Sequence, residues 1–497
     1  RRVRALLRHA YQPCRSRNGG TKDSQRETVK ILFCASEAWP WAKSGGLADV
    51  AYALPKALSQ SAGVTLMIPW YRFMQVALES LERLADVTLS FGGHAYAVTY
   101  YRQQKEGMEV LFVYSELLSE RDYLYGPPGT AYEENDLRFA LFSRAIVAFA
   151  QSARYDILHL NDWHTALAAL FARERGLSAK TLFTIHNLAF QGVFARNRLE
   201  LLGIDSEYFH MEALEFYGRI NFMKAGIAFA DAVTTVSPTY AKEILTPEFG
   251  CGLEGFLRKH RAKLRGIRNG IDTDVFDPEH DKMLACRLKR SLRRFKVCNR
   301  KPLQIAENTL PLFIFIGRMT EQKGVDLLAS LCGELAQLPL IFAFLGDGAG
   351  EISRQLEAAD RKYGNIHYFR GYDERLAHRL YAAADFLVMP SRFEPCGLNQ
   401  MIAMRYGTLP IVHKTGGLAD TVHAIDNKEV ACGRGIVIDK LTPEDLLKAI
   451  RSALALYQKR ERLEALNRFN MACDFSFAGP AEAYLACYRA LQRKKRG

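Results

Sequence analysis

The chain has 497 residues, of which 48% are hydrophobic and 24% are charged. This length is enough for two or three domains with full cores, and the composition is ordinary for a globular protein. The longest apolar runs, such as Ala166–Ala172, are far too short to span a bilayer, so we expect no membrane-spanning segment.

The net charge of +13 lies mainly at the two ends of the chain. Residues 1–30 carry +7 and residues 493–496 carry +4, which leaves +2 for the remainder. One internal segment, 282–301, holds nine basic residues and no acidic one. Because the basic residues do not form a continuous surface interleaved with aromatic residues, the charge argues against a nucleic-acid partner and favours solvated tails and helix faces.

Ten cysteines are scattered along the chain, with no Cys-x-x-Cys pair and no metal-ligand spacing. This pattern predicts free thiols in a reducing compartment rather than disulfides or a metal site. Residues 1–29 are Arg-rich and acid-poor and show no core pattern. We therefore expect a basic N-terminal extension that is either disordered or a targeting segment.

Strands and helices alternate over residues 30–276, which predicts a parallel, doubly wound sheet in a first Rossmann-like domain. The expected strands are Lys30–Ala35, Val64–Pro69, Val110–Tyr114, Ile157–Leu160, Thr181–Ile185 and Ala232–Val236. The expected helices are Leu47–Leu58, Asp136–Ser152, Thr165–Arg175 and Phe222–Phe229.

A second alternating series over residues 311–478 predicts another domain of the same class. Its expected strands are Leu312–Gly317, Leu340–Gly346, Ile366–Gly371, Phe386–Pro390, Thr408–Val412 and Gly435–Ile438, with helices such as Gly324–Ala336 and Glu374–Ala383. The basic segment 277–310 separates the domains, and residues 479–497 hold a last helix, Gly479–Lys494, that could belong to either domain. Ligands in such folds bind at the carboxyl ends of the strands, so we expect a cleft between two facing domains.

The phrase Gly-Gly-Leu-Ala-Asp occurs once in each predicted domain, at 45–49 and at 416–420. Each copy follows a predicted strand and opens a predicted helix, Leu47–Leu58 or Leu418–Ala424. Paired glycines there let a ligand approach the main-chain N–H groups of the first helical turn, which suit a phosphate or another anion. One copy alone would more often be only a tight turn, whereas two copies predict two nucleotide-fold domains that share one ligand.

Most of the candidate polar residues come after predicted strands: Asp162, His186, Arg318, Lys323 and Glu394. Lys43 precedes the first Gly-Gly. Arg318 and Lys323 stand five apart before a helix, where two fixed cations suit a diphosphate, although on spacing alone a pair of solvated charges is about equally expected. Glu394 would repel a phosphate and suits sugar hydroxyls instead. The chain has no Walker-type loop and no Ser-His-Asp ordering, and the missing Gly-x-Gly-x-x-Gly after the first strand counts against a dehydrogenase.

With these motifs the chain resembles the bacterial glycogen synthases and plant starch synthases of glycosyltransferase family 5. The resemblance runs from about Lys30 to Tyr488. It rests on the strings Lys43–Val50, Asn161–His164, Thr184–Leu188, Val236–Ala241, Asn269–Asp272, Gly317–Gly324, Ser391–Leu398 and Thr415–Asp420.

The resemblance implies a GT-B glycosyltransferase with two Rossmann-like domains, the first on the acceptor side and the second on the nucleotide-sugar side. The implied reaction transfers glucose from ADP-glucose to the non-reducing 4-OH of an α-1,4-glucan with retention of configuration, without a metal or other cofactor. The expected partners are ADP-glucose and a glycogen or α-1,4-glucan primer, with no nucleic acid or membrane. The expected location is the bacterial cytoplasm, or a plastid if the N-terminal extension is a transit peptide.

The same resemblance assigns roles to individual residues. The implied catalytic residues are Arg318, Lys323, Glu394 and His186. The implied donor-binding residues are Lys43, Gly45, Gly46, Asn269, Tyr372, Cys396, Gly397, Leu398, Gly416 and Gly417, and the implied acceptor-binding residues are Asp162 and Tyr132. The ring of Tyr372 would stack on adenine. The sequence does not show the paired carboxylates of retaining glycosidases, so we expect same-face attack assisted by the leaving phosphate.

Three alternatives remain open at this point. Another retaining nucleotide-sugar glycosyltransferase of the same fold, such as a sucrose- or trehalose-type enzyme, would not be expected to share Lys43–Leu47 or the full Ser391–Leu398 string. A non-catalytic glucan-binding relative is disfavoured because every expected catalytic position is filled. A nucleic-acid binder is disfavoured by where the positive charge lies.

Overall fold

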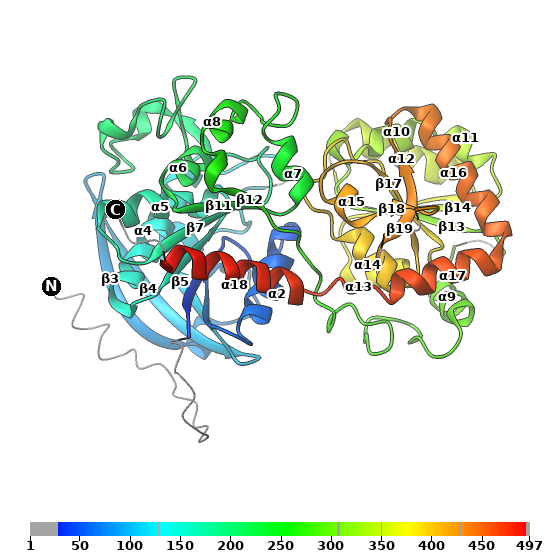
Figure 1. Cartoon of the computed structure of the whole chain (residues 1–497), viewed down its shortest axis with the longest axis horizontal. Coiled ribbons are helices and arrows are strands. Elements are labelled where there is room, and N and C mark those ends of the chain that lie inside the picture. Colours follow the sequence, from blue (N-terminus) through cyan, green and yellow to red (C-terminus); the bar gives the residue numbers. More distant parts are fainter. Residues whose placement is uncertain are drawn as a thin grey trace, which may run out of the picture. The chain divides into compact units, whose positions relative to one another are not determined.

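The computed structural model describes residues 28–493 apart from 128, 306–308, 349, 428 and 431. The predicted N-terminal extension and C-terminal basic tail therefore lie almost wholly outside the described residues. The described chain forms two compact units (Figure 1). Unit 1 contains the residues up to Val236, Ala241–Ile267 and the chain from Phe477 onward, and unit 2 contains Ser237–Tyr240 and Arg268–Ser476.

Unit 1 is built on a nine-stranded sheet in the order β12-β11-β7-β6-β1-β2-β5-β4-β3. Its parallel strands are β1 (Lys30–Cys34), β2 (Gly63–Pro69), β5 (Met108–Tyr114), β6 (Ile157–Asn161), β7 (Lys180–Ile185), β11 (Ala232–Thr235) and β12 (Leu264–Gly266). Strands β3 (Glu82–Phe91) and β4 (His94–Lys105) extend it as an antiparallel hairpin. A separate small sheet holds β8 (Val193–Ala195), β9 (Glu215–Phe216) and β10 (Arg219–Asn221).

The helices of unit 1 cover the parallel part of the central sheet, where strands such as β1, β2, β6 and β7 are buried on both faces as in other parallel sheets. They are α2 (Gly46–Leu58), α3 (Glu116–Ser119), α4 (Asn135–Ala153), α5 (Trp163–Glu174), α6 (Phe222–Phe229), α8 (Glu254–Lys259) and α18 (Ala478–Arg493), with α7 (Pro238–Glu243) divided between the units. Helices α2 and α18 come from opposite ends of the sequence and lie side by side over one face (Figure 1).

Unit 2 is a seven-stranded parallel sheet in the order β15-β14-β13-β16-β17-β19-β18. Its strands are β13 (Leu312–Ile316), β14 (Ile341–Gly346), β15 (Ile366–Arg370), β16 (Phe386–Met389), β17 (Leu409–His413), β18 (His423–Ala424) and β19 (Arg434–Ile438). Its helices are α9 (Leu292–Arg300), α10 (Val325–Ser330), α11 (Cys332–Ala336), α12 (Glu351–Lys362), α13 (Glu374–Ala383), α14 (Asn399–Arg405), α15 (Gly416–Thr421), α16 (Pro443–Gln458) and α17 (Arg460–Met471). Alternate residues of β13 enter two separate cores, Phe313 and Phe315 on one face and Ile314 and Ile316 on the other. The predicted doubly wound sheet is confirmed in both units.

The unit boundary differs from the predicted domain boundary at 276. Residues 268–276 and the basic segment 277–310 belong to unit 2. The Ile271 N–H donates to the Phe475 carbonyl at 2.8 Å, and the Phe276 ring stacks on His378 with centroids 4.9 Å apart. These long-range contacts attach the segment to unit 2, and no local sequence pattern reveals them.

The C-terminal helix, which the sequence left open between the domains, belongs to unit 1. The hydroxyl of Tyr488 on α18 is 2.6 Å from Nδ1 of His159 on β6. Nε2 of His159 is 2.7 Å from the Thr184 hydroxyl on β7. The helix is therefore joined to the centre of the unit 1 sheet by a buried polar chain as well as by apolar packing.

The expectation of free thiols is wrong for four cysteines. Disulfides join Cys286 to Cys298 and Cys432 to Cys473, with Cα–Cα distances of 5.9 and 5.4 Å. The fold of unit 2 brings these residues together, whereas pairing cannot be deduced from cysteine spacing alone.

The basic segment 282–301 owes part of its charge to the interior of unit 2. Within α9, Arg293 and Arg294 are exposed, whereas Lys296 and Arg300 are buried. Lys296 donates to the carbonyl of Ala384 and to the Thr408 hydroxyl, the latter at 3.0 Å. Burial lowers the pKa of Lys296 to about 7.

Arg300 completes this arrangement. It donates to the carbonyls of Ala383 and Leu310, each at 2.9 Å, and is ion-paired with the buried Asp385. Ala383 and Ala384 end α13, where the last carbonyls of a helix lack partners within the helix and attract cations. Arg300 and the Lys296 amine therefore both supply donors to the carbonyls of a helix terminus.

We predict that Arg300→Met lowers the free energy of unfolding of unit 2 by about 3–5 kcal/mol, because it leaves the buried Asp385 without its counter-charge. Arg294→Met removes an exposed cation from the same helix and should cost less than about 0.5 kcal/mol. Hydrogen exchange of unit 2 peptides in urea measures both, since Trp39, Trp41, Trp70 and Trp163 all lie in unit 1 and do not report on unit 2. Equal losses in the two variants would contradict the structural role of Arg300.

Candidate active site

The first Gly-Gly turn lies at the N-terminus of α2, after β1. Gly45 is the N-cap residue and has no side chain with which to cap the helix. Nζ of Lys43 is 2.7 Å from a carboxylate oxygen of Asp49 in the first helical turn. The Ser44 N–H donates to Glu37. A phosphate at this turn would therefore meet the N–H groups that follow Ser44 and the ammonium of Lys43.

Glu37 is a buried carboxylate that the sequence did not single out. It accepts the Ser44 N–H, the Ser44 hydroxyl at 2.8 Å and the Tyr125 hydroxyl at 3.2 Å. Burial raises its pKa to about 7; the hydrogen bonds oppose this shift, and the nearby charge of Asp49 adds to it. Its place just after β1 was the available signal, but only the structure shows that the side chain turns inward.

Asp162 and His186 lie together after the neighbouring strands β6 and β7. The His186 N–H donates to Oδ1 of Asp162 at 2.7 Å, and Nε2 of His186 is 2.9 Å from Oδ1 of Asn161. Burial raises the pKa of Asp162 to about 7 and lowers the pKa of His186 to about 3. The imidazole is therefore neutral at pH 7. Asp162 has φ +56°, a strained conformation for a non-glycine residue of the kind that clusters at functional sites.

Tyr132 lies in the segment between α3 and α4. Its N–H donates to the Tyr125 carbonyl at 2.9 Å, and its hydroxyl accepts the Tyr123 N–H at 3.2 Å. The guanidinium of Arg138 is 5.3 Å from its ring centroid. Arg138 is fully buried and also donates to the Leu124 carbonyl at 2.9 Å. Tyr132 is thus held by main-chain contacts and one buried arginine.

In unit 2 the loops after β13 and β16 bring Lys323 and Glu394 into contact. Nζ of Lys323 is 2.6 Å from Oε2 of Glu394, which also accepts the Ser391 hydroxyl at 2.9 Å. The Glu394 side chain is 6% exposed and that of Lys323 is 21% exposed, so a ligand can reach the ammonium while the carboxylate is nearly enclosed. A cation suited to a phosphate and a carboxylate suited to sugar hydroxyls therefore lie side by side.

Two glycines allow the loops of unit 2 to approach each other closely. Gly324 has φ +66°, and a Cβ there would lie 1.8 Å from the Pro390 carbonyl oxygen. Gly417, the second residue of α15, donates its N–H to the Glu394 carbonyl at 3.0 Å, and a Cβ there would lie 2.0 Å from the Cys396 carbonyl oxygen. Any other side chain at either position would force the loops that carry Lys323 and Glu394 apart.

Three further predicted residues of unit 2 have distinct surroundings. Nη2 of Arg318 is 3.4 Å from Oε1 of Gln322. Asn269 is buried and hydrogen-bonds Cys396, while its Oδ1 has no hydrogen-bond partner within the described residues. A buried amide oxygen requires a donor, which a sugar hydroxyl could supply. Tyr372 is 60% exposed and follows β15, two strands from β13 in the sheet.

The predicted site residues thus form separate groups in the two units. Unit 1 holds Lys43, Gly45, Gly46, Tyr132, Asp162 and His186, and unit 2 holds Asn269, Arg318, Lys323, Tyr372, Glu394, Cys396, Gly397, Leu398, Gly416 and Gly417. Within the described residues, no group of three or more His, Cys, Asp or Glu side chains is placed to hold a metal ion. None of the described helices is both long and apolar enough to cross a membrane.

Residues 30–259 match the family model of the starch synthase catalytic domain, and residues 299–468 match that of glycosyl transferases group 1. The glycogen synthase of Aquifex aeolicus is 43% identical over 473 residues, covering 93% of this chain and 99% of that protein. The glycogen synthase of Anaeromyxobacter sp. is 41% identical over 481 residues, covering 93% of this chain and 99% of that protein. The chain belongs to the glycogen and starch synthase family.

The solved structures agree with this family. The catalytic domain of starch synthase IV from Arabidopsis thaliana, bound to ADP and acarbose, matches with a TM-score of 0.87 and 33% identity over 94% of this chain and 100% of that chain. A sucrose-phosphate synthase from Thermosynechococcus elongatus matches with a TM-score of 0.62 at 18% identity, a likeness of fold alone. The protein is thus a glycosyltransferase of the glycogen and starch synthase family, with the two Rossmann-like domains of the GT-B class. The resemblance found in the sequence is confirmed.

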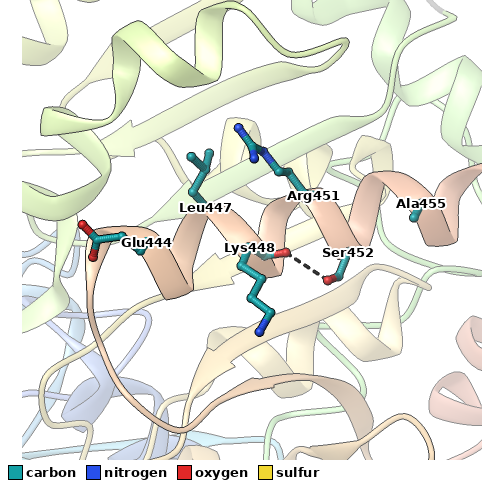
Figure 2. A pocket seen from close by; sticks show the side chains of 6 residues that line it. All are labelled: Glu444, Leu447, Lys448, Arg451, Ser452 and Ala455. Carbon is teal, nitrogen blue, oxygen red and sulfur yellow. Dashed lines mark hydrogen bonds between the residues drawn. The ribbon is translucent and has the colours of Figure 1, made fainter.

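A shallow hollow on the outer face of α16 is separate from these groups (Figure 2). Its lining residues come from this one helix: Glu444, Leu447, Lys448, Arg451, Ser452 and Ala455. Figure 2 shows the charged ends of Lys448 and Arg451 pointing to opposite sides of the helix, so they do not converge on one anion. The hollow has none of the features expected of the active site of this family.

Asp162 should make the stability of this glycosyltransferase depend on pH. Its pKa is raised from 3.8 to about 7, so between these values the folded chain keeps a proton that the unfolded chain has released. The free energy of unfolding therefore falls as the pH rises through this range. Asp162→Asn cannot titrate but keeps an acceptor for the His186 N–H, so it should remove this part of the slope.

Urea unfolding followed by the fluorescence of the unit 1 tryptophans, from pH 5 to pH 8, measures the slope of the free energy of unfolding against pH. The same slope in Asp162→Asn and wild type would contradict the prediction, and the exposed Asp122→Asn serves as the control.

Proposed function

We propose that this member of the glycogen and starch synthase family transfers glucose from ADP-glucose to the non-reducing 4-OH of an α-1,4-glucan with retention of configuration. The proposal rests on the contact between Lys323 and Glu394. In this contact a cation suited to a phosphate lies beside a carboxylate suited to sugar hydroxyls. The glycogen synthase names of the relatives support the reaction, and the ADP and acarbose bound by the related starch synthase support the two ligand classes.

The residues of unit 2 would act on the donor. Arg318 and Lys323 hold the diphosphate and neutralise the charge that it gains as the glucosyl–phosphate bond breaks, which is the main electrostatic task of such a reaction. Glu394 accepts hydrogen bonds from the hydroxyls of the transferred glucose, and Oδ1 of Asn269 accepts another. Tyr372 stacks on adenine. The main chain at 396–398 and the helix start at 416–417 contact the donor sugar or phosphate.

The residues of unit 1 would act on the phosphates and the acceptor. Lys43 and the turn at Gly45 and Gly46 bind the donor phosphates, and Asp162 and Tyr132 contact the glucan. His186 lies near the reacting carbon as a neutral imidazole. Its low pKa argues against a role as a general acid at neutral pH.

Donor specificity tests the proposal directly. Purified protein with glycogen should incorporate labelled glucose from ADP-glucose in preference to UDP-glucose, and the product should release the label as glucose or maltose with an amylase specific for α-1,4 bonds. Folded protein that incorporates glucose from neither nucleotide would contradict the proposed function. A preference for UDP-glucose would contradict the proposed donor but not the family.

Lys323→Ala removes the phosphate-binding cation of the proposed site. Turnover should fall by roughly two or more orders of magnitude, as for other losses of transition-state charge stabilisation. Lys440→Ala removes an exposed lysine of the same unit and should leave turnover unchanged. Steady-state rates with ADP-glucose and glycogen measure both variants, and normal turnover of Lys323→Ala would show that the diphosphate binds elsewhere.

A further inference from the structure

Glu37 joins two segments of unit 1 that the proposed function assigns to different substrates. One of its oxygens accepts the Ser44 N–H, and the other accepts the Ser44 hydroxyl at 2.8 Å and the Tyr125 hydroxyl at 3.2 Å. Ser44 lies between Lys43 and the Gly-Gly turn, which would bind the donor phosphates. Tyr125 lies in the segment that holds Tyr132, a proposed acceptor residue.

Several contacts hold Tyr125 in place. Its carbonyl accepts the Tyr132 N–H at 2.9 Å and the side-chain amide of Asn135 at 2.8 Å. Its ring stacks on His164 with centroids 4.6 Å apart, and its hydroxyl is 2.8 Å from the Ser36 hydroxyl. A displacement of Tyr132 would therefore move Tyr125, and through it the carboxylate of Glu37.

The Ser44 side depends on Glu37. The Ser44 residue itself is exposed, as are Gly45 and Gly46, so packing does not fix this turn. Gly45 cannot cap the helix, and glycines allow many backbone conformations. Ser44 donates two hydrogen bonds to the buried carboxyl group of Glu37. They fix the conformation of the residue between Lys43 and the paired glycines.

We infer that Glu37 is a positioning residue that couples the proposed phosphate turn at Lys43–Gly46 to the proposed acceptor segment that holds Tyr125 and Tyr132. The inference rests on the proposed function for the identity of the two ligands, whereas the coupling itself is a property of the contacts of Glu37. Glu37 acts through Ser44 and Tyr125 and is assigned no contact with substrate. The consequence is that a change on the acceptor segment alters binding of the donor.

Hydrogen exchange in the ligand-free protein tests the coupling without reference to activity. Tyr125→Phe removes the hydroxyl that reaches Glu37 and should speed exchange of the amides at 43–47 by roughly tenfold. Glu37→Gln replaces one acceptor oxygen by a donor and should have at least this effect. Tyr123→Phe changes an exposed ring on the same segment and should have none. Unchanged exchange at 43–47 in Tyr125→Phe, in a folded protein, would overturn the inference.

Kinetics test the consequence for substrate binding. Tyr125→Phe and Ser44→Ala should each raise KM for ADP-glucose several-fold with a smaller change in kcat, and Ser44→Thr, which keeps the hydroxyl, should restore KM. In a Glu37→Gln background, Tyr125→Phe should cause no further rise, because residues that act through one partner are not additive. Additive effects would overturn the coupling. If Glu37→Gln does not fold, Tyr125→Phe combined with Ser44→Ala gives the same comparison.

Hydrogen exchange and the activity assay together distinguish a failure of the proposed function from a failure of the role assigned to Glu37. If exchange shows the coupling but wild-type protein uses no ADP-glucose, the proposed donor is wrong and the role of Glu37 as a positioning residue stands. If wild-type protein uses ADP-glucose and exchange at 43–47 is unaffected in Tyr125→Phe, the proposed function stands and the role of Glu37 is wrong.

Discussion

The ion pair between Lys323 and Glu394 is the contact on which the functional account depends. It places opposite charges 2.6 Å apart at the ends of two neighbouring strands, β13 and β16, with the carboxylate nearly enclosed. It exists only because Gly324 and Gly417 let main-chain segments approach to distances that a Cβ would forbid. A diphosphate that reaches this place would compete with Glu394 for the ammonium and leave the carboxylate to the hydroxyls of the sugar.

Unit 1 contributes buried groups of a different kind. Glu37 and Asp162 are carboxyls whose pKa values burial raises to about 7, and His186 is an imidazole that burial keeps neutral. Glu37 and Asp162 accept hydrogen bonds from main-chain N–H groups, and Nε2 of His186 donates to Oδ1 of Asn161. Such groups fix the position of neighbouring loops in water-poor surroundings, and Glu37 and Asp162 titrate near neutral pH.

Much of the fold could be predicted because parallel strands buried on both faces are continuous apolar runs, such as 312–316 and 181–185. The β3–β4 hairpin is largely exposed and contains no such apolar run, so the sequence did not reveal this hairpin. The sequence could single out Lys323 and Glu394 because they come after strands, and their role in the site stays a prediction. Glu37 follows a strand as well, but its inward orientation depends on Ser44 and Tyr125, which are distant in the sequence or unremarkable in type. The buried roles of Lys296 and Arg300, like the two disulfides, depend on tertiary contacts that charge counting and cysteine spacing cannot supply.

An experimental structure of the protein with bound ADP tests the central claim most directly. The account predicts phosphate oxygens within hydrogen-bonding distance of Nζ of Lys323 and of the Arg318 guanidinium, with Lys323 displaced from Glu394. A diphosphate bound away from both cations, with the Lys323–Glu394 contact intact, would contradict the account.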